Sequence, residues 1–108
     1  MRLAPAAALA ALKDSGDGRP FVRLFAHGSL EVEVYKPAER DLQAPHARDE
    51  VYVVIAGQGE FVYAGRRQPF VAGELLFAPA GIEHHFENFS DDFSTWVLFY
   101  GPEGGEPE

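Results

Sequence analysis

The feature that most constrains this chain is a series of short apolar runs that begins at Phe21 and continues almost to the C-terminus. Each run has the length of a β-strand, and Gly, Pro, Asp or Ser separates it from the next. Short runs rich in Val, Tyr and Phe are typical of strands, because helices need longer segments with a different period. The pattern predicts an all-β sandwich or barrel built from FVRLFA, SLEVEVY, EVYVVIA, GEFVYA, ELLFA, HHFENF and STWVLFY.

Two of these runs predict different surroundings. Residues 30–35 alternate apolar residues with Glu31 and Glu33, as in a strand with one wet face. Residues 51–55 are apolar on both faces, so this strand needs cover on both sides. The barrel interior would cover one side, and the N-terminal helix or a partner subunit would cover the other.

The length of 108 residues suits one compact domain and is too short for two ordinary ones. Residues 1–20 are expected to form an N-terminal helix, over residues 4–13 with Pro5 in its first turn, and a linker. The barrel is expected over residues 21–100. The ending GPEGGEPE, residues 101–108, predicts a loose acidic tail because it has nothing to bury.

Composition excludes several classes of partner and chemistry. Asp and Glu total 17 against 9 Lys and Arg, and no basic cluster occurs, so neither nucleic acid nor an anionic membrane surface is an expected partner. The absence of cysteine removes disulfides, thiolate metal sites and a cysteine nucleophile. The Ala-rich start is short and weakly apolar for a signal peptide, and no window of about 18 apolar residues could span a membrane. We therefore expect a cytoplasmic protein.

His46 and Glu50 are metal-capable side chains that stand just before an apolar strand. On one straight strand their α-carbons would lie about 13 Å apart, at about 3.3 Å per residue, which is too far for both to reach one small cation. A bend is needed between them. We expect residues 47–49 to form a three-residue hairpin loop, with His46 ending one strand and Glu50 starting the next.

A second stretch, GELLFAPAGIEHHFEN, combines a turn with two histidines. Pro79 and Gly81 suit positions i+1 and i+3 of a type I turn, followed by a strand from about Ile82. On that strand His84 shares a face with apolar residues, whereas His85 shares a face with acidic ones. A histidine that points inward among apolar residues needs a partner, usually a metal ion or a carboxylate.

These two stretches resemble the paired motifs of the cupin family. The second cupin motif is Gly, five residues, Pro, any residue, Gly, two residues, His, three residues, Asn. The chain fills all five fixed places, with Gly73, Pro79, Gly81, His84 and Asn88. We interpret Pro79, Asn88 and the glycines as architectural rather than chemical.

The first cupin motif is Gly, five residues, His-x-His, three or four residues, Glu, six residues, Gly. His46, Glu50 and Gly57 match it with the correct spacing, but Ala38 replaces the leading Gly and Ala44 replaces the leading His. The resemblance covers roughly residues 28 to 100 and is closest to small single-domain bacterial cupins of the RmlC-like superfamily.

The resemblance implies a small jelly-roll β-barrel, often dimeric, that holds one divalent metal ion inside. Cupins use His, His, Glu and His as ligands, and by position this chain offers His46, Glu50 and His84. Such a set of two imidazoles and one carboxylate suits iron, manganese, nickel or zinc. Gln43 neighbours the position of the missing ligand, Ala44, but on a regular strand its parity directs it away.

Aromatic side chains near the expected site are candidates for binding a substrate. Tyr52 and Phe86 lie two residues from expected ligands on the inward face, and Tyr35, Phe77 and Trp96 are expected to contribute from neighbouring strands. Core packing is the alternative role for each. If these aromatics line a cavity, it favours apolar or aromatic ligands over anionic ones.

Three functions remain open from the sequence. The first is a metal-dependent enzyme, dioxygenase-like or isomerase-like, that acts on a small organic molecule. The second is a non-catalytic binding or sensor module on the same barrel. The third is a vestigial, metal-free dimerisation domain. A small-molecule ligand and a homodimer are the expected partners.

Overall fold

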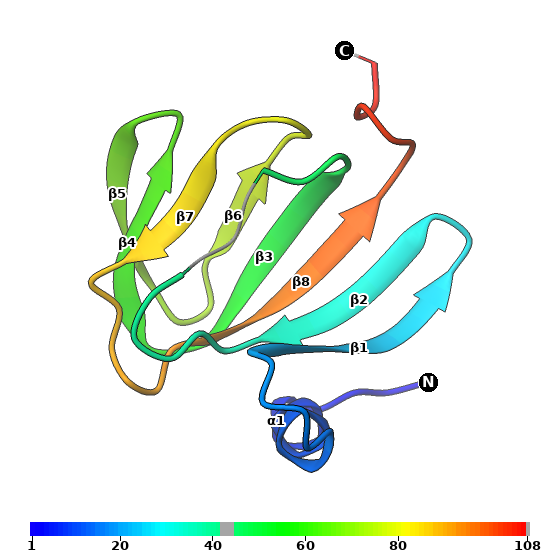
Figure 1. Ribbon diagram of the computed structural model, residues 1–108, viewed down its shortest axis with the longest axis vertical. Coiled ribbons are helices and arrows are strands. Elements are labelled where there is room, and N and C mark those ends of the chain that lie inside the picture. Colours follow the sequence, from blue (N-terminus) through cyan, green and yellow to red (C-terminus); the bar gives the residue numbers. More distant parts are fainter. Residues whose placement is uncertain (42–44, 108) are drawn as a thin grey trace.

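The chain forms one helix and eight strands in the part that the structure describes, which is a computed structural model of residues 1–41 and 45–107 (Figure 1). All strand pairs are antiparallel. The predicted all-β fold with a short N-terminal helix is confirmed. The elements are α1 (Pro5–Asp14), β1 (Phe21–His27), β2 (Leu30–Tyr35), β3 (Asp49–Ala56), β4 (Gln58–Tyr63), β5 (Arg66–Val71), β6 (Leu75–Ala78), β7 (His84–Glu87) and β8 (Ser94–Tyr100).

The strands form two sheets, and the chain passes repeatedly from one sheet to the other (Figure 1). Over the described residues, the large sheet has the order β1-β2-β8-β3-β6, and the small sheet has the order β5-β4-β7. After β3 the chain enters the small sheet for β4 and β5 and returns to the large sheet for β6. It then crosses to the small sheet for β7 and back to the large sheet for β8. This alternation is that of a jelly roll, in which two sheets face each other across one core.

Aromatic rings fill the core between the sheets. Phe86 and Phe93 lie with ring centroids 4.8 Å apart, and Tyr52 packs edge-on against Phe86 at 5.0 Å. These separations suit favourable tilted and edge-to-face aromatic pairs. Gly57 allows Phe93 to come this close, since a Cβ at Gly57 would lie 2.6 Å from the Phe93 Cα.

Helix α1 lies outside the large sheet, beside β1 and β2 (Figure 1). Ala8 of the helix is fully buried, and so is Val34 of β2. Glu31 and Glu33 lie on the other face of β2, which borders an interior cavity. The predicted alternation of β2 is therefore correct, and its polar face looks into the barrel while its apolar face lies on the side of the helix.

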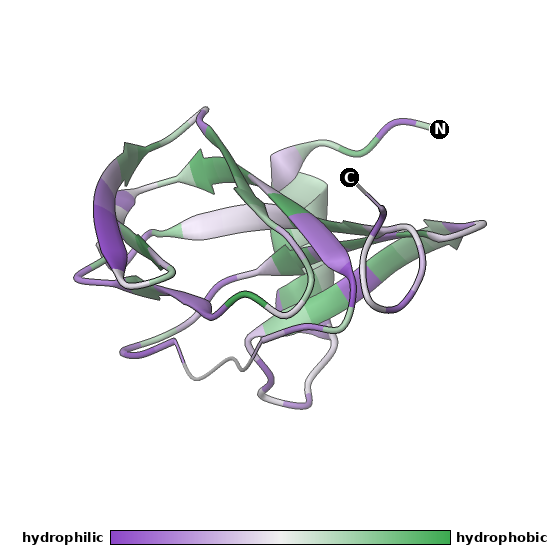
Figure 2. Cartoon of the chain, turned by 90° about the horizontal axis from the view of Figure 1, so that it is seen from above, coloured by the Kyte–Doolittle hydropathy of each residue, from purple (hydrophilic) through white to green (hydrophobic). Residues whose placement is uncertain are grey.

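Strand β5 is the strand that the sequence pattern missed. Arg66, Arg67 and Pro69 give it a hydrophilic and proline-containing sequence, and it is largely hydrophilic in Figure 2. Such a strand is tolerated at a sheet edge, where one row of backbone donors faces solvent, and β5 is an edge strand. A tight turn at Ala64 and Gly65, both at positive φ, joins it to β4 in the manner of a hairpin.

The C-terminal segment is held against the barrel, in contrast to the predicted loose tail. The N–H of Gly104 donates to the Ala47 carbonyl at 2.7 Å, and the N–H of Glu106 donates to Asp49 Oδ2 at 2.8 Å. Arg48 Nε donates to the carbonyl of Gly101 at 3.0 Å. The tail prediction failed because these contacts use backbone groups, which a composition of Gly, Pro and Glu does not reveal.

Candidate metal centre

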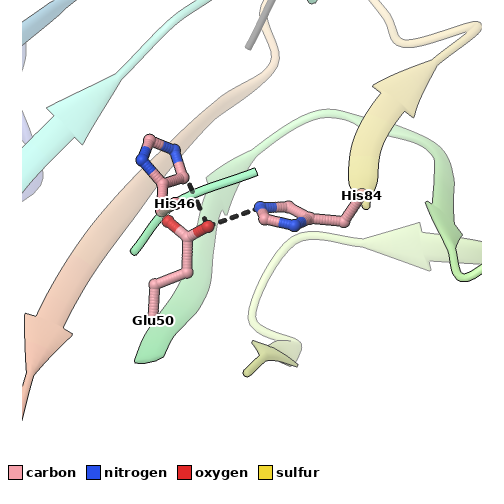
Figure 3. A group of neighbouring side chains, drawn as sticks. All are labelled: His46, Glu50 and His84. Atoms are coloured by element: carbon pink, nitrogen blue, oxygen red, sulfur yellow. Dashed lines mark ion pairs between the residues drawn. The ribbon is translucent and has the colours of Figure 1, made fainter. Parts of the chain in front are cut away.

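Three side chains from separate parts of the chain converge at one end of the barrel (Figure 3). Glu50 is the second residue of β3, His84 is the first residue of β7, and His46 lies in the segment that leads into β3. One ligand atom from each lies within 4.8 Å of the others. His46 Nε2 is 3.8 Å from Glu50 Oε1, and His84 Nε2 forms an ion pair with the same oxygen. The predicted set is thus brought together.

The backbone route to His46 differs from the predicted hairpin. Asp49 is already the first residue of β3, and residues 45–48 have no strand pairing. A bend at Ala47 and Arg48 still brings His46 back over Glu50. The predicted need for a bend is correct, but the carrier of His46 is an irregular segment. Gln43 and Ala44 lie outside the described residues.

The turn before β7 is also offset from its prediction. The N–H of Ile82 donates to the Pro79 carbonyl at 3.3 Å, so Pro79 is the first residue of the turn, and Gly81 is the third, with φ +79°. A positive φ at the third position is typical of a type II turn rather than type I. Strand β7 begins at His84 rather than near Ile82.

The predicted parity of the two adjacent histidines is confirmed. His84 is 2% exposed and faces the core. His85 is half-buried on the opposite face, where its Nε2 pairs with a carboxylate oxygen of Glu87. One register step therefore separates an interior histidine from a surface histidine.

Glu50 is a fully buried carboxylate whose Oε1 contacts Nε2 of His84, and no group in the described part of the chain donates a hydrogen bond to its Oε2. His84 Nδ1 lies 2.7 Å from the Ile82 carbonyl oxygen, which can only accept, so Nδ1 carries a hydrogen. The lone pair of neutral His84 is then on Nε2, which faces Glu50. Two electron-rich atoms that face each other in a buried site require a cation between them, either a proton or a metal ion.

Without a metal ion, the contact with Glu50 favours a proton on His84. Burial opposes protonation of His84, but the contact with Glu50 and the bond to the Ile82 carbonyl together raise the His84 pKa above its ordinary value. The Tyr52 hydroxyl also lies 3.1 Å from His84 Nε2. His84 Nε2 is therefore the atom on which the polar groups of the site converge.

A cavity of about 840 Å³ opens beside the candidate ligands, and His46 and Glu50 form part of its wall. Apolar side chains line one part of it and carboxylates another. The pKa of Glu33 is raised, first because burial disfavours its charged form and then because Glu31 and Glu50 lie nearby. The residues that line the cavity include Phe21, Glu31, Glu33, Tyr35, Val97 and Phe99.

The predicted aromatic residues divide into three groups. Tyr35 lines the cavity, and its hydroxyl donates to Asp41 at 2.6 Å. Tyr52 and Phe86 are buried in the core next to His84. Phe77 and Trp96 pair with Val51 and Val53, respectively, and these alternate with Glu50 and Tyr52. Their predicted inward position is corrected, because they lie on the outer face of the large sheet.

Sequence reasoning did not single out three acidic residues that structure this region. Asp41 accepts hydrogen bonds from the Tyr35 hydroxyl and from the N–H of Phe86, and so bridges the two sheets. Asp49 accepts from two backbone amides. Glu33 lines the cavity. Only Glu33 had a detectable signal, since the alternation in β2 placed it on a polar face without saying what that face meets.

Comparisons with known proteins agree with this geometry. A family model described as Cupin domain matches residues 31–100. An uncharacterized protein of Streptomyces coelicolor is 30% identical over 97 residues, which cover 88% of this chain and 91% of that protein. The crystal structure of protein NMB1881 from Neisseria meningitidis is similar, with a TM-score of 0.72 and 19% identity. The match covers 94% of this chain and 100% of that chain.

The fold is also similar to that of an enzyme. The crystal structure of the DMSP lyase DddQ from Ruegeria pomeroyi matches with a TM-score of 0.64 and 27% identity. The match covers 75% of this chain but 46% of the enzyme's chain, so the similarity spans less than half of that protein. The family match over residues 31–100, together with the two-sheet barrel, shows that this chain belongs to the cupin domain family.

Proposed function

We propose that this cupin binds one divalent metal ion through His46, Glu50 and His84. The observation that carries the proposal is the buried Glu50 carboxylate, whose Oε1 lies between two imidazoles and whose Oε2 lacks a hydrogen-bond donor among the described residues. Nδ1 of His84 is held by the Ile82 carbonyl, which orients the ring with Nε2 toward Glu50. Such outer hydrogen bonds are a common support of metal-binding histidines.

The donor set suits several metals. Two imidazole nitrogens and one carboxylate oxygen are ligands that iron(II), manganese, nickel and zinc all accept, and three protein ligands leave positions open for water or substrate. When bound, such an ion supplies Lewis-acid chemistry or, if it is redox-active, one-electron chemistry with dioxygen. Thiolate-dependent sites are excluded because the chain has no cysteine.

We propose further that the protein is an enzyme that acts on a small organic molecule in the adjacent cavity. The volume of about 840 Å³ suits a small ligand. Phe21, Val97 and Phe99 offer apolar surface to orient it, and the wall also carries carboxylates together with Arg40 and Arg48. Glu33 is the wall carboxyl whose raised pKa suits it to exchange a proton with a bound ligand.

A dioxygenase-like or isomerase-like reaction is the proposed class, because open metal positions beside a cavity allow a substrate to bind directly. The similarity to a DMSP lyase supports an enzymatic role in general, and brings lyase chemistry into the set to be tested. The second candidate is a non-catalytic binding or sensor module. Ala44, in place of the usual leading histidine, favours it, because one ligand fewer weakens metal retention.

The test is metal analysis of protein purified without added salts, followed by reconstitution with each metal and an assay panel. We expect close to one metal ion per chain, and turnover of a phenol, diketone or small lyase substrate with one of the metals. Less than about a tenth of an equivalent that reconstitution does not restore would reject the metal centre. Full metal occupancy and ligand binding without turnover would favour the binding module.

We also propose that the protein is a homodimer that associates through the outer face of the large sheet. Leu75 and Phe77 lie on that face in the edge strand β6, and they are 64% and 45% exposed. Half-buried Val51 and Val53 of β3 extend the apolar surface.

No helix in the described part of the chain is long and apolar enough to cross a membrane. A cytoplasmic location stays a prediction from the sequence.

A further inference from the structure

Asp49 is a buried carboxylate that no candidate metal position uses. It directly precedes Glu50 in β3 and is 4% exposed. Its Oδ1 accepts a hydrogen bond from the N–H of Ala80 at 2.8 Å, and its Oδ2 accepts one from the N–H of Glu106 at 2.8 Å. These bonds hold the pKa of Asp49 below its ordinary value. One side chain therefore joins three segments of the chain.

The first segment that Asp49 holds is the turn that leads into His84. Ala80 lies within this turn, and the next residue, Gly81, donates its N–H to the carbonyl of His46 at 2.9 Å. The turn is thus bonded both to the residue before Glu50 and to His46 itself. Through these two bonds, the segment that carries His46 and Glu50 is fixed against the segment that carries His84.

The second segment is the C-terminal strap, which we define as residues 101–106. It contacts both the ligand-bearing segment and the turn at Ala80. Gly104 donates its N–H to the carbonyl of Ala47, and Arg48 donates to the carbonyl of Gly101. Both residues of the bend that follows His46 are therefore bonded to the strap.

The strap fits closely at the point where it meets Asp49. Gly105 has φ +90°, and a Cβ added there would lie 3.0 Å from Asp49 Oδ1 and 3.2 Å from the Cβ of Ala80. Gly104, the preceding residue, has φ +89°, and a Cβ there would meet nothing within 4 Å. An alanine at either position would carry the same backbone strain, but only the methyl group at position 105 would press against Asp49 and Ala80.

We propose that Asp49 is a positioning residue, and that it and the C-terminal strap hold His46 and Glu50 at the correct separation from His84 for metal binding. This inference rests on the proposed metal centre. Ligands held in place before binding lose less freedom when the ion arrives, so a loosened joint lowers affinity without removing any ligand. The strap thereby adds to the metal centre a part of the chain outside both cupin motifs.

The test compares Gly105→Ala with Gly104→Ala, and adds Asp49→Asn. Apparent zinc affinity is measured by competition with a chromogenic chelator, and thermal stability is measured in EDTA. We expect Gly105→Ala and Asp49→Asn to weaken zinc binding by about 10- to 100-fold, the usual effect of disturbing a ligand's supporting contacts. Gly104→Ala carries the same backbone strain but adds no contact at Asp49, so it should weaken zinc binding less than Gly105→Ala does. Equal affinities for both glycine variants would overturn the proposal.

Hydrogen exchange of the Ala80 and Gly81 amides in metal-free protein gives a second readout, which separates this inference from the metal centre. Gly81 does not bond to the strap, and its N–H bonds to the His46 carbonyl. We expect Gly105→Ala to speed exchange at both amides more than Gly104→Ala does. If the unmodified protein binds none of the four metals, the metal centre is rejected. Unchanged exchange at Gly81 in Gly105→Ala would reject the positioning role, whatever the outcome for the metal centre. Because Gly105→Ala leaves the Asp49 side chain in place, the test stands even if Asp49→Asn does not fold.

Discussion

At the scale of single residues, His84 and His85 provide a matched pair. His84 is buried beside Glu50, whereas His85 pairs with Glu87 on the opposite face of the same strand. His84→Ala removes one of three proposed ligands, so we expect apparent zinc affinity to fall by more than about 100-fold, beyond the usual loss from a supporting residue. His85→Ala should retain the metal content of the unmodified protein. Metal analysis and chelator competition measure both, and unchanged metal content in His84→Ala would reject the ligand assignment.

Tyr52 allows a more specific test of the same atom. Its hydroxyl lies 3.1 Å from His84 Nε2, the atom whose lone pair is proposed to bind the metal. The hydrogen bond between this hydroxyl and Nε2 is available only in the metal-free protein, because a metal ion at Nε2 would replace it. Tyr52→Phe should destabilise the metal-free protein by about 1 kcal/mol, a typical net value for one hydrogen bond. The same change should raise zinc affinity by about fivefold, the corresponding free energy.

Denaturant unfolding in EDTA and zinc competition check the two halves of this prediction, and Tyr100→Phe serves as the control because no hydrogen bond to the candidate ligands involves Tyr100 within the described residues. A fall in zinc affinity in Tyr52→Phe would show instead that the phenol oxygen supports or binds the metal.

At the scale of elements, strand β2 places carboxylates inside the barrel. Glu33 is half-buried on the cavity wall, and burial, followed by the nearby charges of Glu31 and Glu50, raises its pKa. Arg23 acts in the opposite direction. A raised folded-state pKa means that Glu33 favours folding below the ordinary glutamate pKa, and that this contribution is lost as the pH rises through the folded-state pKa.

Glu33→Gln should therefore raise the Tm by a few degrees at pH 7 in EDTA, and the difference should disappear below about pH 4, where the carboxyl is protonated in both states. Glu31→Gln is the control on the same face of β2. Glu31 pairs with Arg23 at 3.2 Å and with Arg48 at 3.6 Å, so its loss should leave the Tm unchanged or slightly lower. A pH-independent effect of Glu33→Gln on the Tm would contradict the charge explanation.

Elements also differ in how well their sequence predicted them. Strand β2 was predictable because burial of one face imposes a period of two, and β8 was predictable as a short apolar run. Strand β5 was missed because an edge strand can be hydrophilic and can contain Pro69. The turn of residues 79–82 was predicted with its positions offset by one, since proline and glycine are compatible with more than one turn type.

At the scale of the whole molecule, the exposed apolar residues of β6 predict association. We expect the protein to elute as a dimer, and Leu75→Asp to convert it to a monomer, because a charge in an apolar interface would be desolvated without a partner. Val71→Asp is the control, since Val71 is 52% exposed but lies on β5 in the other sheet. Light scattering coupled to size exclusion measures the mass. A monomeric unmodified protein, or dissociation by Val71→Asp alone, would reject this interface.

The fold class and the three candidate ligands could be read from the chain because each depends on local pattern. Strand periodicity follows from backbone geometry, and His46, Glu50 and His84 were named through the resemblance to two cupin motifs, each of which is local in the sequence. Parity separated His84 from His85, but it did not give the surroundings of every strand face. Glu33 faces a cavity, Phe77 and Trp96 face outward, and residues 101–106 are bonded to the barrel. These arrangements depend on which segments pack together, and contacts between residues distant in sequence leave no periodic trace in either partner.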